Sequence, residues 1–152
     1  MKIIVTGLES SGTKWMTQML SKHPDVTEVA HTSIPEYLMI HPIKTRWPDL
    51  TGADFVVWML RYEPFRLKSI LTLDYDAGRD LEFLPPNLYE HCRRLFLGAG
   101  CPIVMVSYEG LIGPIGQLVF ENACAQMGLI PDKMPEGFFV SKDANEKYVV
   151  GG

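Results

Sequence analysis

The sequence predicts a single α/β domain in which a central, mostly parallel sheet lies between two layers of helices. Short apolar, β-branched runs alternate with amphipathic helical segments, and apolar strands in this order are typical of parallel sheets covered on both faces. The chain has 152 residues, which is enough for one substantial core and too few for two. We therefore expect one domain over residues 1–152.

A strand, a helix and a second strand are predicted at the start of the chain. Lys2–Thr6 is a β-branched run ended by Gly7, which is typical of a buried strand. Residues 13–22 carry apolar side chains at helical spacing, and the His-Pro pair at 23–24 ends that helix. Val26–Ala30 then predicts a second short strand.

The middle of the chain contains the clearest strand, Asp54–Leu60, with the sequence DFVVWML. Before it, residues 31–52 contain three prolines and a glycine, which predicts an irregular excursion with at most one helical turn. After it, residues 64–73 predict a helix with proline in its first turn. Residues 74–86 are polar, contain glycine and proline, and predict a loop.

The last third of the chain predicts two helices around one strand. Residues 87–98 are amphipathic, begin with an asparagine that can cap a helix and end with a glycine. Residues 102–107, PIVMVS, predict another buried strand. Residues 114–128 predict a helix ending at glycine, and residues 129–152 predict mostly irregular structure.

Composition indicates a soluble globular protein, with 47% hydrophobic and 21% charged residues. The net charge of −4 argues against a general nucleic-acid binder, although a local pocket can still attract a small anion. No apolar run reaches 18 residues, so no membrane-spanning helix is expected, and the chain starts without a signal-peptide pattern. We expect neither nucleic acid nor membrane as a partner.

The three cysteines predict reduced thiols. Their number is odd, and no two of them have the spacing of a redox or zinc motif. We therefore expect a cytoplasmic protein with no disulfide framework. Cys101 and Cys124 stand in apolar surroundings and are expected in the core.

The most informative stretch is IIVTGLESSGTKW, in which Gly7 follows a strand and Gly12 opens a helix. Backbone N–H groups at a helix N-terminus bind phosphate well, and glycines allow a close approach. Gly7 and Gly12 have the separation of the ATP- and GTP-binding pattern GxxxxGK[ST], but Thr13 and Lys14 are exchanged relative to it. The alternative is a turn in which Ser11 or Thr13 merely caps the helix.

This loop resembles the 5′-phosphosulfate loop of the sulfotransferases. The matching residues are Ser10, Ser11, Gly12, Thr13, Lys14 and Trp15. The resemblance implies a three-layer fold like that of the P-loop NTPases and nucleotide kinases. It also implies that these six residues bind the donor 3′-phosphoadenosine 5′-phosphosulfate, and that no metal is needed.

Two further segments match the same family. VVWMLRYEPFRLKS places Arg61 after a strand and Ser69 eight residues later, as in the family's site for the donor's 3′-phosphate. VMVSYEGL is similar to a family segment that follows a strand, and the resemblance implies that Tyr108 lines the adenine pocket. A fourth match, LSKHPDV, contains His23, which we expect to be structural. The loop motif, residues 61–69 and residues 107–109 lie near the carboxyl ends of predicted strands, where ligands of parallel sheets bind.

Two catalytic roles are hypothesised. In the family the catalytic lysine stands at the place of Ser10, and we hypothesise that Lys14, one helical turn later, contacts the sulfuryl oxygens instead. The acceptor hydroxyl needs a general base, for which His31 is the first candidate because it follows the second predicted strand. Glu36 and His41 are the alternatives in the same excursion.

The expected activity is transfer of a sulfuryl group from this donor to a hydroxyl or amine of a small-molecule or carbohydrate acceptor. One alternative is a small nucleotide or metabolite kinase, which would need Mg²⁺ and an acidic ligand such as Glu109. The other is a nucleotide-binding module without catalysis. The identity of the acceptor and the oligomeric state cannot be inferred from the sequence.

Overall fold

The computed structural model describes residues 1–8, 11–34, 49–62, 88–130 and 139, and the structural statements below concern these residues. They contain four strands and four helices. The strands are β1 (Lys2–Leu8), β2 (Glu28–Ile34), β3 (Phe55–Leu60) and β4 (Ile103–Ser107). The helices are α1 (Thr13–Leu20), α4 (Leu88–Leu97), α5 (Tyr108–Ile112) and α6 (Gly116–Gln126).

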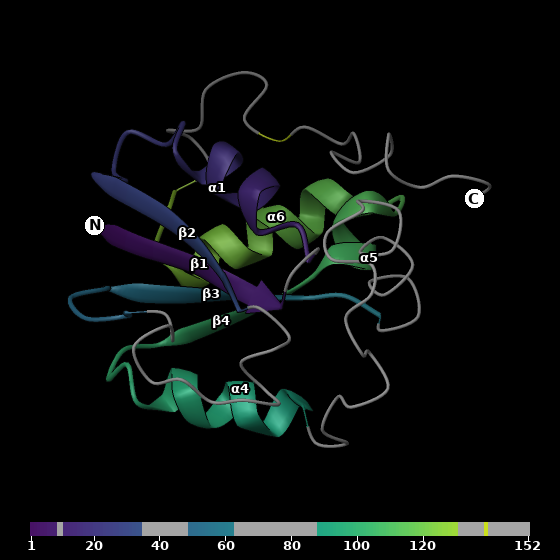
Figure 1. Ribbon diagram of the computed structural model, residues 1–152. Helices are drawn as coiled ribbons and strands as arrows, with labels where there is room; N and C mark the ends of the chain where they lie inside the picture. Colours follow the sequence, from purple (N-terminus) through teal and green to yellow (C-terminus); the bar gives the residue numbers. More distant parts are fainter. Residues whose placement is uncertain (9–10, 35–48, 63–87, 131–138, 140–152) are drawn as a thin grey trace.

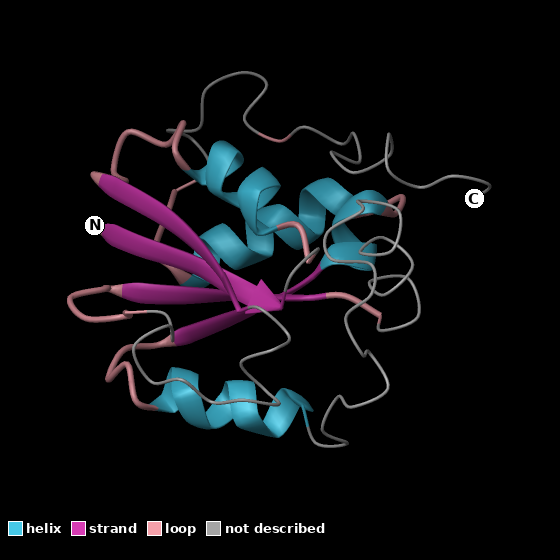
Figure 2. Ribbon diagram, viewed as in Figure 1, coloured by secondary structure: helices cyan, strands magenta, loops and turns pink. Residues whose placement is uncertain are grey.

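The four described strands form one parallel sheet in the order β2-β1-β3-β4 (Figure 2). β1 is central and pairs along its length with β2 and over four residues with β3; Val5, for example, lies between His31 and Val57. The predicted α/β fold with a parallel sheet is therefore confirmed.

Helices cover both faces of the sheet: α1, α5 and α6 lie on one face and α4 on the other (Figure 1). Each face has its own buried cluster. On the α1 face, Ile3 and Val5 of β1 pack with residues of α1 and α6, whereas Ile4 and Leu8 pack on the α4 face. Successive side chains of a strand point to opposite faces, so a strand covered on both sides must be apolar throughout. This explains the uninterrupted apolar run at the start of the sequence.

The strand order creates a switch point between β1 and β3. From β1 the chain moves through α1 to β2 on one side, and β3 and β4 then continue on the other side. In open parallel sheets, connections that leave in opposite directions open a crevice beyond the carboxyl ends of the two central strands. Gly7 and Arg61 lie at these two ends.

The predicted elements correspond closely to the observed ones, with two corrections. The second strand was predicted at 26–30 but extends from Glu28 to Ile34, because it pairs with β1 residue by residue. α5 was not predicted; Ser107 begins it by accepting a hydrogen bond from the Gly110 backbone N–H at 3.0 Å. The predicted helix 64–73, loop 74–86 and most of the excursion and tail lie outside the described residues.

His23 is structural, as expected. Its side chain is buried, and its Nδ1 accepts a hydrogen bond from the Asp25 backbone N–H at 3.1 Å. The opposite ring nitrogen, Nε2, lies 3.4 Å from the Ile130 carbonyl oxygen, to which it can donate. The ring therefore joins the end of α1 to the segment after α6.

The three cysteines carry free thiols. Cys124 is buried, as predicted, and burial raises the pKa of its thiol to about 12. Cys101 is only partly buried, so its assignment to the core was too strong. Within the described part of the chain, no helix is long and apolar enough to span a membrane.

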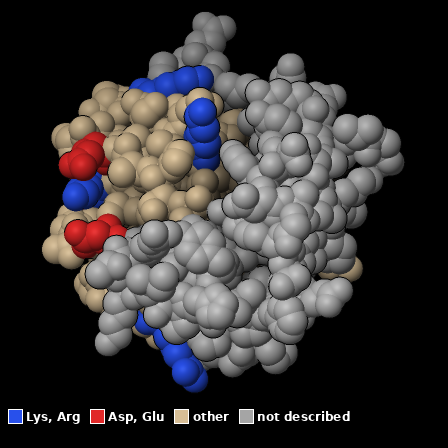
Figure 3. All heavy atoms as spheres, in the orientation of Figure 1, with Lys and Arg blue, Asp and Glu red and all other residues tan. Residues whose placement is uncertain are grey.

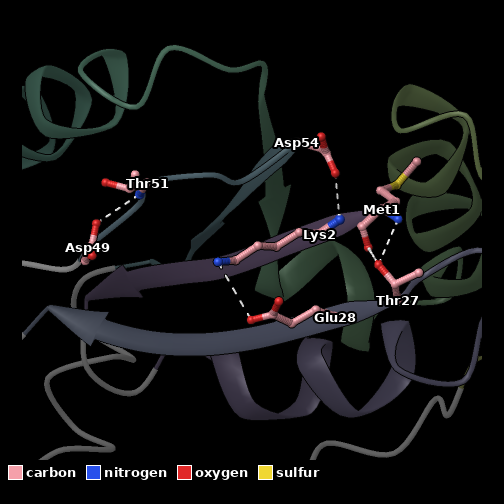
Figure 4. A network of polar contacts seen from close by, with 7 residues as sticks. All are labelled: Met1, Lys2, Thr27, Glu28, Asp49, Thr51 and Asp54. Atoms are coloured by element: carbon pink, nitrogen blue, oxygen red, sulfur yellow. Dashed lines mark hydrogen bonds and ion pairs between the residues drawn. The ribbon is translucent and has the colours of Figure 1, made fainter.

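A network of polar contacts joins the amino-terminal ends of β1, β2 and β3 (Figure 4). The backbone N–H of Lys2 donates to the Asp54 carboxylate at 2.7 Å, and the Asp54 N–H donates back to the Lys2 carbonyl at 2.8 Å. The Lys2 ammonium forms an ion pair with Glu28 at 3.7 Å. The Thr27 backbone N–H and hydroxyl both donate to the Met1 carbonyl. This end of the sheet is thus fixed by reciprocal hydrogen bonds.

Candidate functional site

Gly7 brings β1 close to β3 at the carboxyl end of the sheet. Its φ is +156°, and a Cβ atom placed on it would lie 2.7 Å from the Met59 carbonyl oxygen. Any larger residue would push the two strands apart here. Gly7 therefore allows the close spacing of β1 and β3 at the end of the sheet where the candidate site begins.

Gly12 opens α1 in a conformation that few other residues adopt. Its φ of 82° and ψ of 21° are left-handed, and its carbonyl accepts the Met16 N–H at 3.1 Å. A Cβ on Gly12 would lie 2.7 Å from Cδ2 of Tyr108. The N-cap position is held by Gly12 itself, which has no side chain to cap the helix; whether this turn binds a ligand or only starts α1 stays a prediction. The first N–H groups of a helix lack intrahelical partners, which makes this end suitable for an anion.

The remaining motif residues divide into a buried and an exposed set. Ser11, Thr13 and Trp15 are buried, whereas Lys14 is exposed on the outer side of α1, together with Gln18 one turn later. Neighbouring helix residues differ by about 100° in direction, so Lys14 and Thr13 point to different sides. The exchange of lysine and threonine relative to the kinase pattern thus places the hydroxyl inside and the ammonium outside.

Arg61 is a buried charge at the carboxyl end of β3. Its side chain is only 6% exposed, and its Cζ atom lies 4.2 Å from the centroid of the Tyr108 ring. A buried guanidinium is costly unless other groups compensate for its lost hydration, and the face of an aromatic ring provides one such contact. The sequence predicted a functional arginine at this position, and the structure places it beside the residue that touches Gly12.

Tyr108 lies at the centre of the candidate site. The ring is 1% exposed, meets Trp15 edge to face with centroids 5.9 Å apart, and contacts both Gly12 and Arg61. It therefore brings together the start of α1, the end of β3 and the end of β4. Its predicted role in lining an adenine pocket stays a prediction, because the ring is covered in this structure.

Glu109 connects the ends of β3 and β4 directly. Its Oε1 accepts a hydrogen bond from the backbone N–H of Tyr62 at 2.8 Å. Sequence reasoning considered Glu109 only as a metal ligand of the kinase alternative and missed this contact. No local pattern could have revealed it, because the two residues are 47 positions apart.

Two buried polar atoms near the motif have no hydrogen-bond partner within the described chain, Oγ1 of Thr6 and Nε1 of Trp15. Unpartnered buried polar groups are rare in folded proteins and often mark a binding site. Thr6 immediately precedes Gly7, and Trp15 packs against Tyr108. The signal for Thr6 was present in the sequence as a hydroxyl inside an apolar strand.

His31 lies within β2 rather than after it, so the prediction that it follows the strand was wrong in position. It is exposed and in register with Val5, three residues before Ile34 ends the strand. At about 3.3 Å per residue this places it roughly 10 Å from the strand's end. Its role as a base stays a prediction.

Four of the predicted site residues lie outside the described residues: Ser10, Glu36, His41 and Ser69. Gly12, Trp15, Arg61 and Tyr108 are brought together, with Ser11 and Thr13 flanking Gly12 in the chain. Comparison with protein-family models, with curated proteins and with solved structures gives no match.

Proposed function

We propose that this protein binds 3′-phosphoadenosine 5′-phosphosulfate at the carboxyl end of its sheet and transfers the sulfuryl group to a hydroxyl or amine of a small-molecule or carbohydrate acceptor. The observation that carries the proposal is that buried Arg61 and the N-terminus of α1 both contact the Tyr108 ring. A guanidinium and a helix N-terminus are both favourable to phosphate and sulfate groups.

The buried positive charge of this site comes from Arg61. On the face drawn in Figure 3, the described Lys and Arg side chains stand among mostly uncharged residues and form no continuous basic patch. With a net charge of −4, the protein does not attract anions by its overall field. A buried arginine beside a helix N-terminus favours a small anion that enters the site over a nucleic-acid backbone that lies across a surface.

The residues near Gly12 fit a phosphate-bearing donor. A Cβ at position 12 would clash with the Tyr108 ring, so only glycine allows the ring to pack this closely against the start of α1. Ser11 and Thr13 flank it with hydroxyls, and the unpartnered Nε1 of Trp15 is a further donor. In the proposed arrangement Gly12 and Thr13 hold the 5′-phosphosulfate and Arg61 holds the 3′-phosphate.

The donor, when bound, supplies the sulfuryl group and leaves as 3′,5′-ADP. The chain must supply positive charge for the transferring oxygens and must accept the acceptor's proton. Lys14 is proposed for the first task and His31 for the second. Both side chains are exposed, so each would act from the solvent side of the site.

A non-catalytic nucleotide-binding module is the second candidate, and one observation favours it. Lys14 lies on the outer face of α1, while the position that holds the lysine of the kinase pattern is occupied by buried Thr13. A site with Arg61 but without an inward lysine would bind the donor and transfer nothing. The kinase alternative is less supported, because the position of its lysine is occupied by Thr13 and its metal ligand would have to be Glu109 rather than an aspartate.

Thermal unfolding with added nucleotides separates these functions. We expect 3′,5′-ADP to raise the midpoint without Mg²⁺, because only a specific ligand of the folded state stabilises it. A shift produced by Mg²⁺-ATP alone would favour the kinase. A shift with 3′,5′-ADP but no transfer of labelled sulfate to any of a panel of alcohols, sugars and amines would favour the binding module.

The catalytic assignments are tested by substitution. Lys14→Ala should lower turnover and leave the affinity for 3′,5′-ADP almost unchanged, with Gln18→Ala as the control on the same exposed face of α1. His31→Ala should remove the acidic limb of the pH–rate profile. Wild-type turnover in Lys14→Ala, or an intact acidic limb in His31→Ala, would exclude the corresponding role.

A further inference from the structure

Three parts of the protein meet at the Tyr108 ring. The guanidinium of Arg61 lies over its face, with Cζ 4.2 Å from the centroid. The backbone of Gly12 lies so close that a Cβ there would be 2.7 Å from Cδ2 and 3.0 Å from Cε2. Trp15 meets the ring edge to face. The ring therefore contacts both groups that are proposed to bind the donor, the Arg61 guanidinium and the N-terminus of α1.

A contact of this kind restricts the orientation of the arginine guanidinium. Its side chain has several rotatable bonds and loses much conformational entropy when it is fixed. A ring face attracts the flat guanidinium and restricts it to a plane above the ring, while its N–H groups can point outward from the rim. The Tyr108 ring thus limits Arg61 to a small set of positions.

The Tyr108 ring is itself fixed by its two neighbours in the chain. Ser107 caps α5 through the Gly110 N–H at 3.0 Å, and Glu109 accepts the N–H of Tyr62 at 2.8 Å. Tyr62 directly follows Arg61, so the backbone next to the arginine is bonded to the side chain of the residue next to the tyrosine. This bond helps to keep the Arg61 and Tyr108 segments together.

We propose that Tyr108 is a positioning residue that holds the Arg61 guanidinium beside the N-terminus of α1 through its ring face. The role of this guanidinium in binding a phosphate rests on the proposed function; the holding of Arg61 does not. The aromatic ring of Tyr108 holds the guanidinium, and the tyrosine hydroxyl is not required for this. This differs from a contact between the tyrosine hydroxyl and a nucleobase, which would depend on the hydroxyl.

The test compares Tyr108→Phe, which keeps the ring, with Tyr108→Leu, which removes it. Phe96→Leu is the control, since Phe96 is equally buried but packs against Trp58 on the α4 face. Two quantities are measured in each folded variant: the NMR shift of the Arg61 side-chain protons, which a ring face moves upfield, and the Kd for 3′,5′-ADP by calorimetry.

We expect Tyr108→Phe and Phe96→Leu to keep both the upfield Arg61 signal and the wild-type Kd. In Tyr108→Leu the Arg61 signal should lose its upfield shift, and binding should weaken about tenfold, which lies within the range expected for loss of a cation–π contact. Loss of stability alone would change Phe96→Leu in the same way as Tyr108→Leu.

Three results would overturn the inference: an unchanged Arg61 signal in Tyr108→Leu, an unchanged Kd in that variant, or a tenfold loss of affinity in Tyr108→Phe. The last of these would assign the contact to the hydroxyl, and it remains decisive if Tyr108→Leu does not fold. If wild-type protein binds no 3′,5′-ADP, the proposed function fails, and the Arg61 signal alone decides whether Tyr108 holds the arginine.

Discussion

The two ends of the sheet are built in opposite ways. At the amino-terminal end, Lys2 and Asp54 exchange hydrogen bonds and Lys2 pairs with Glu28 near solvent. At the carboxyl end, a charged arginine is buried against an aromatic ring, and two glycines with positive φ allow close packing against the Met59 backbone and the Tyr108 ring. The first arrangement stabilises the fold with ordinary surface chemistry. The second places costly groups where ligands of parallel sheets bind, which is typical of functional sites.

Among the substitutions that test this comparison, Gly12→Ala should have the largest effect on stability and binding. The new methyl group would require both a left-handed alanine and displacement of the Tyr108 ring, and we expect a loss of about 3 kcal/mol in the free energy of unfolding. Binding of 3′,5′-ADP should disappear. Gly100→Ala is the matched control, because Gly100 has φ of 70° but nothing within 4 Å of its Cβ position; it should lose only about 1 kcal/mol. Equal losses in urea denaturation would contradict the role of the Tyr108 contact.

Arg61→Met should separate function from stability. Methionine fills similar volume but loses the cation–π contact with Tyr108, so we expect the free energy of unfolding to fall by about 2 kcal/mol at most. The affinity for 3′,5′-ADP should fall about 30-fold or more, since charge-assisted hydrogen bonds are among the strongest in proteins. Calorimetric titration and urea denaturation measure the two effects. Arg94→Met, on the exposed side of α4, should leave affinity unchanged, and a comparable loss there would refute the assignment of Arg61.

Asp54→Ala, at the amino-terminal end of the sheet, should affect mainly stability, whereas Arg61→Met should affect mainly affinity. It removes the acceptor of the Lys2 N–H, and the stability should fall by about 1 kcal/mol, because the group is exposed and water replaces part of the bond. The Kd for 3′,5′-ADP should not change. A weaker Kd in this variant would show that the two ends are coupled through β1 and β3.

Asp49→Asn should have the smallest effect, visible mainly at low pH. The hydroxyl and the backbone N–H of Thr51 lower the pKa of the Asp49 carboxyl below its ordinary value of 3.8. The carboxylate therefore stabilises the folded state above about pH 4, and this contribution is lost as the pH falls through the lowered pKa. The stability difference between Asp49→Asn and wild type should shrink from pH 7 to pH 3 in urea denaturation. A constant difference would show that Thr51 does not lower this pKa.

Local patterns in the sequence were sufficient to predict the parallel sheet and the position of Gly12 and Arg61. Apolar runs, helical spacing and glycine punctuation act over a few residues, and each strand was placed at nearly its observed position. The boundaries of β2 were missed because its length is set by pairing with β1. The contacts of Tyr108 and Glu109 were missed because they join residues far apart in the chain. Strand order determines such contacts, and no local pattern encodes it.

The β4–α5 junction has a consequence for the engineering of this site. Three successive residues there contact three different partners: Ser107 caps α5, Tyr108 meets Gly12 and Arg61, and Glu109 binds the Tyr62 backbone. Inserting or deleting one residue would turn every later side chain of α5 by about 100°. We therefore expect a change of length at the junction to disturb more contacts than any single substitution. A designer who transfers the proposed anion site to another parallel sheet would need to copy the tripeptide and its spacing as one unit.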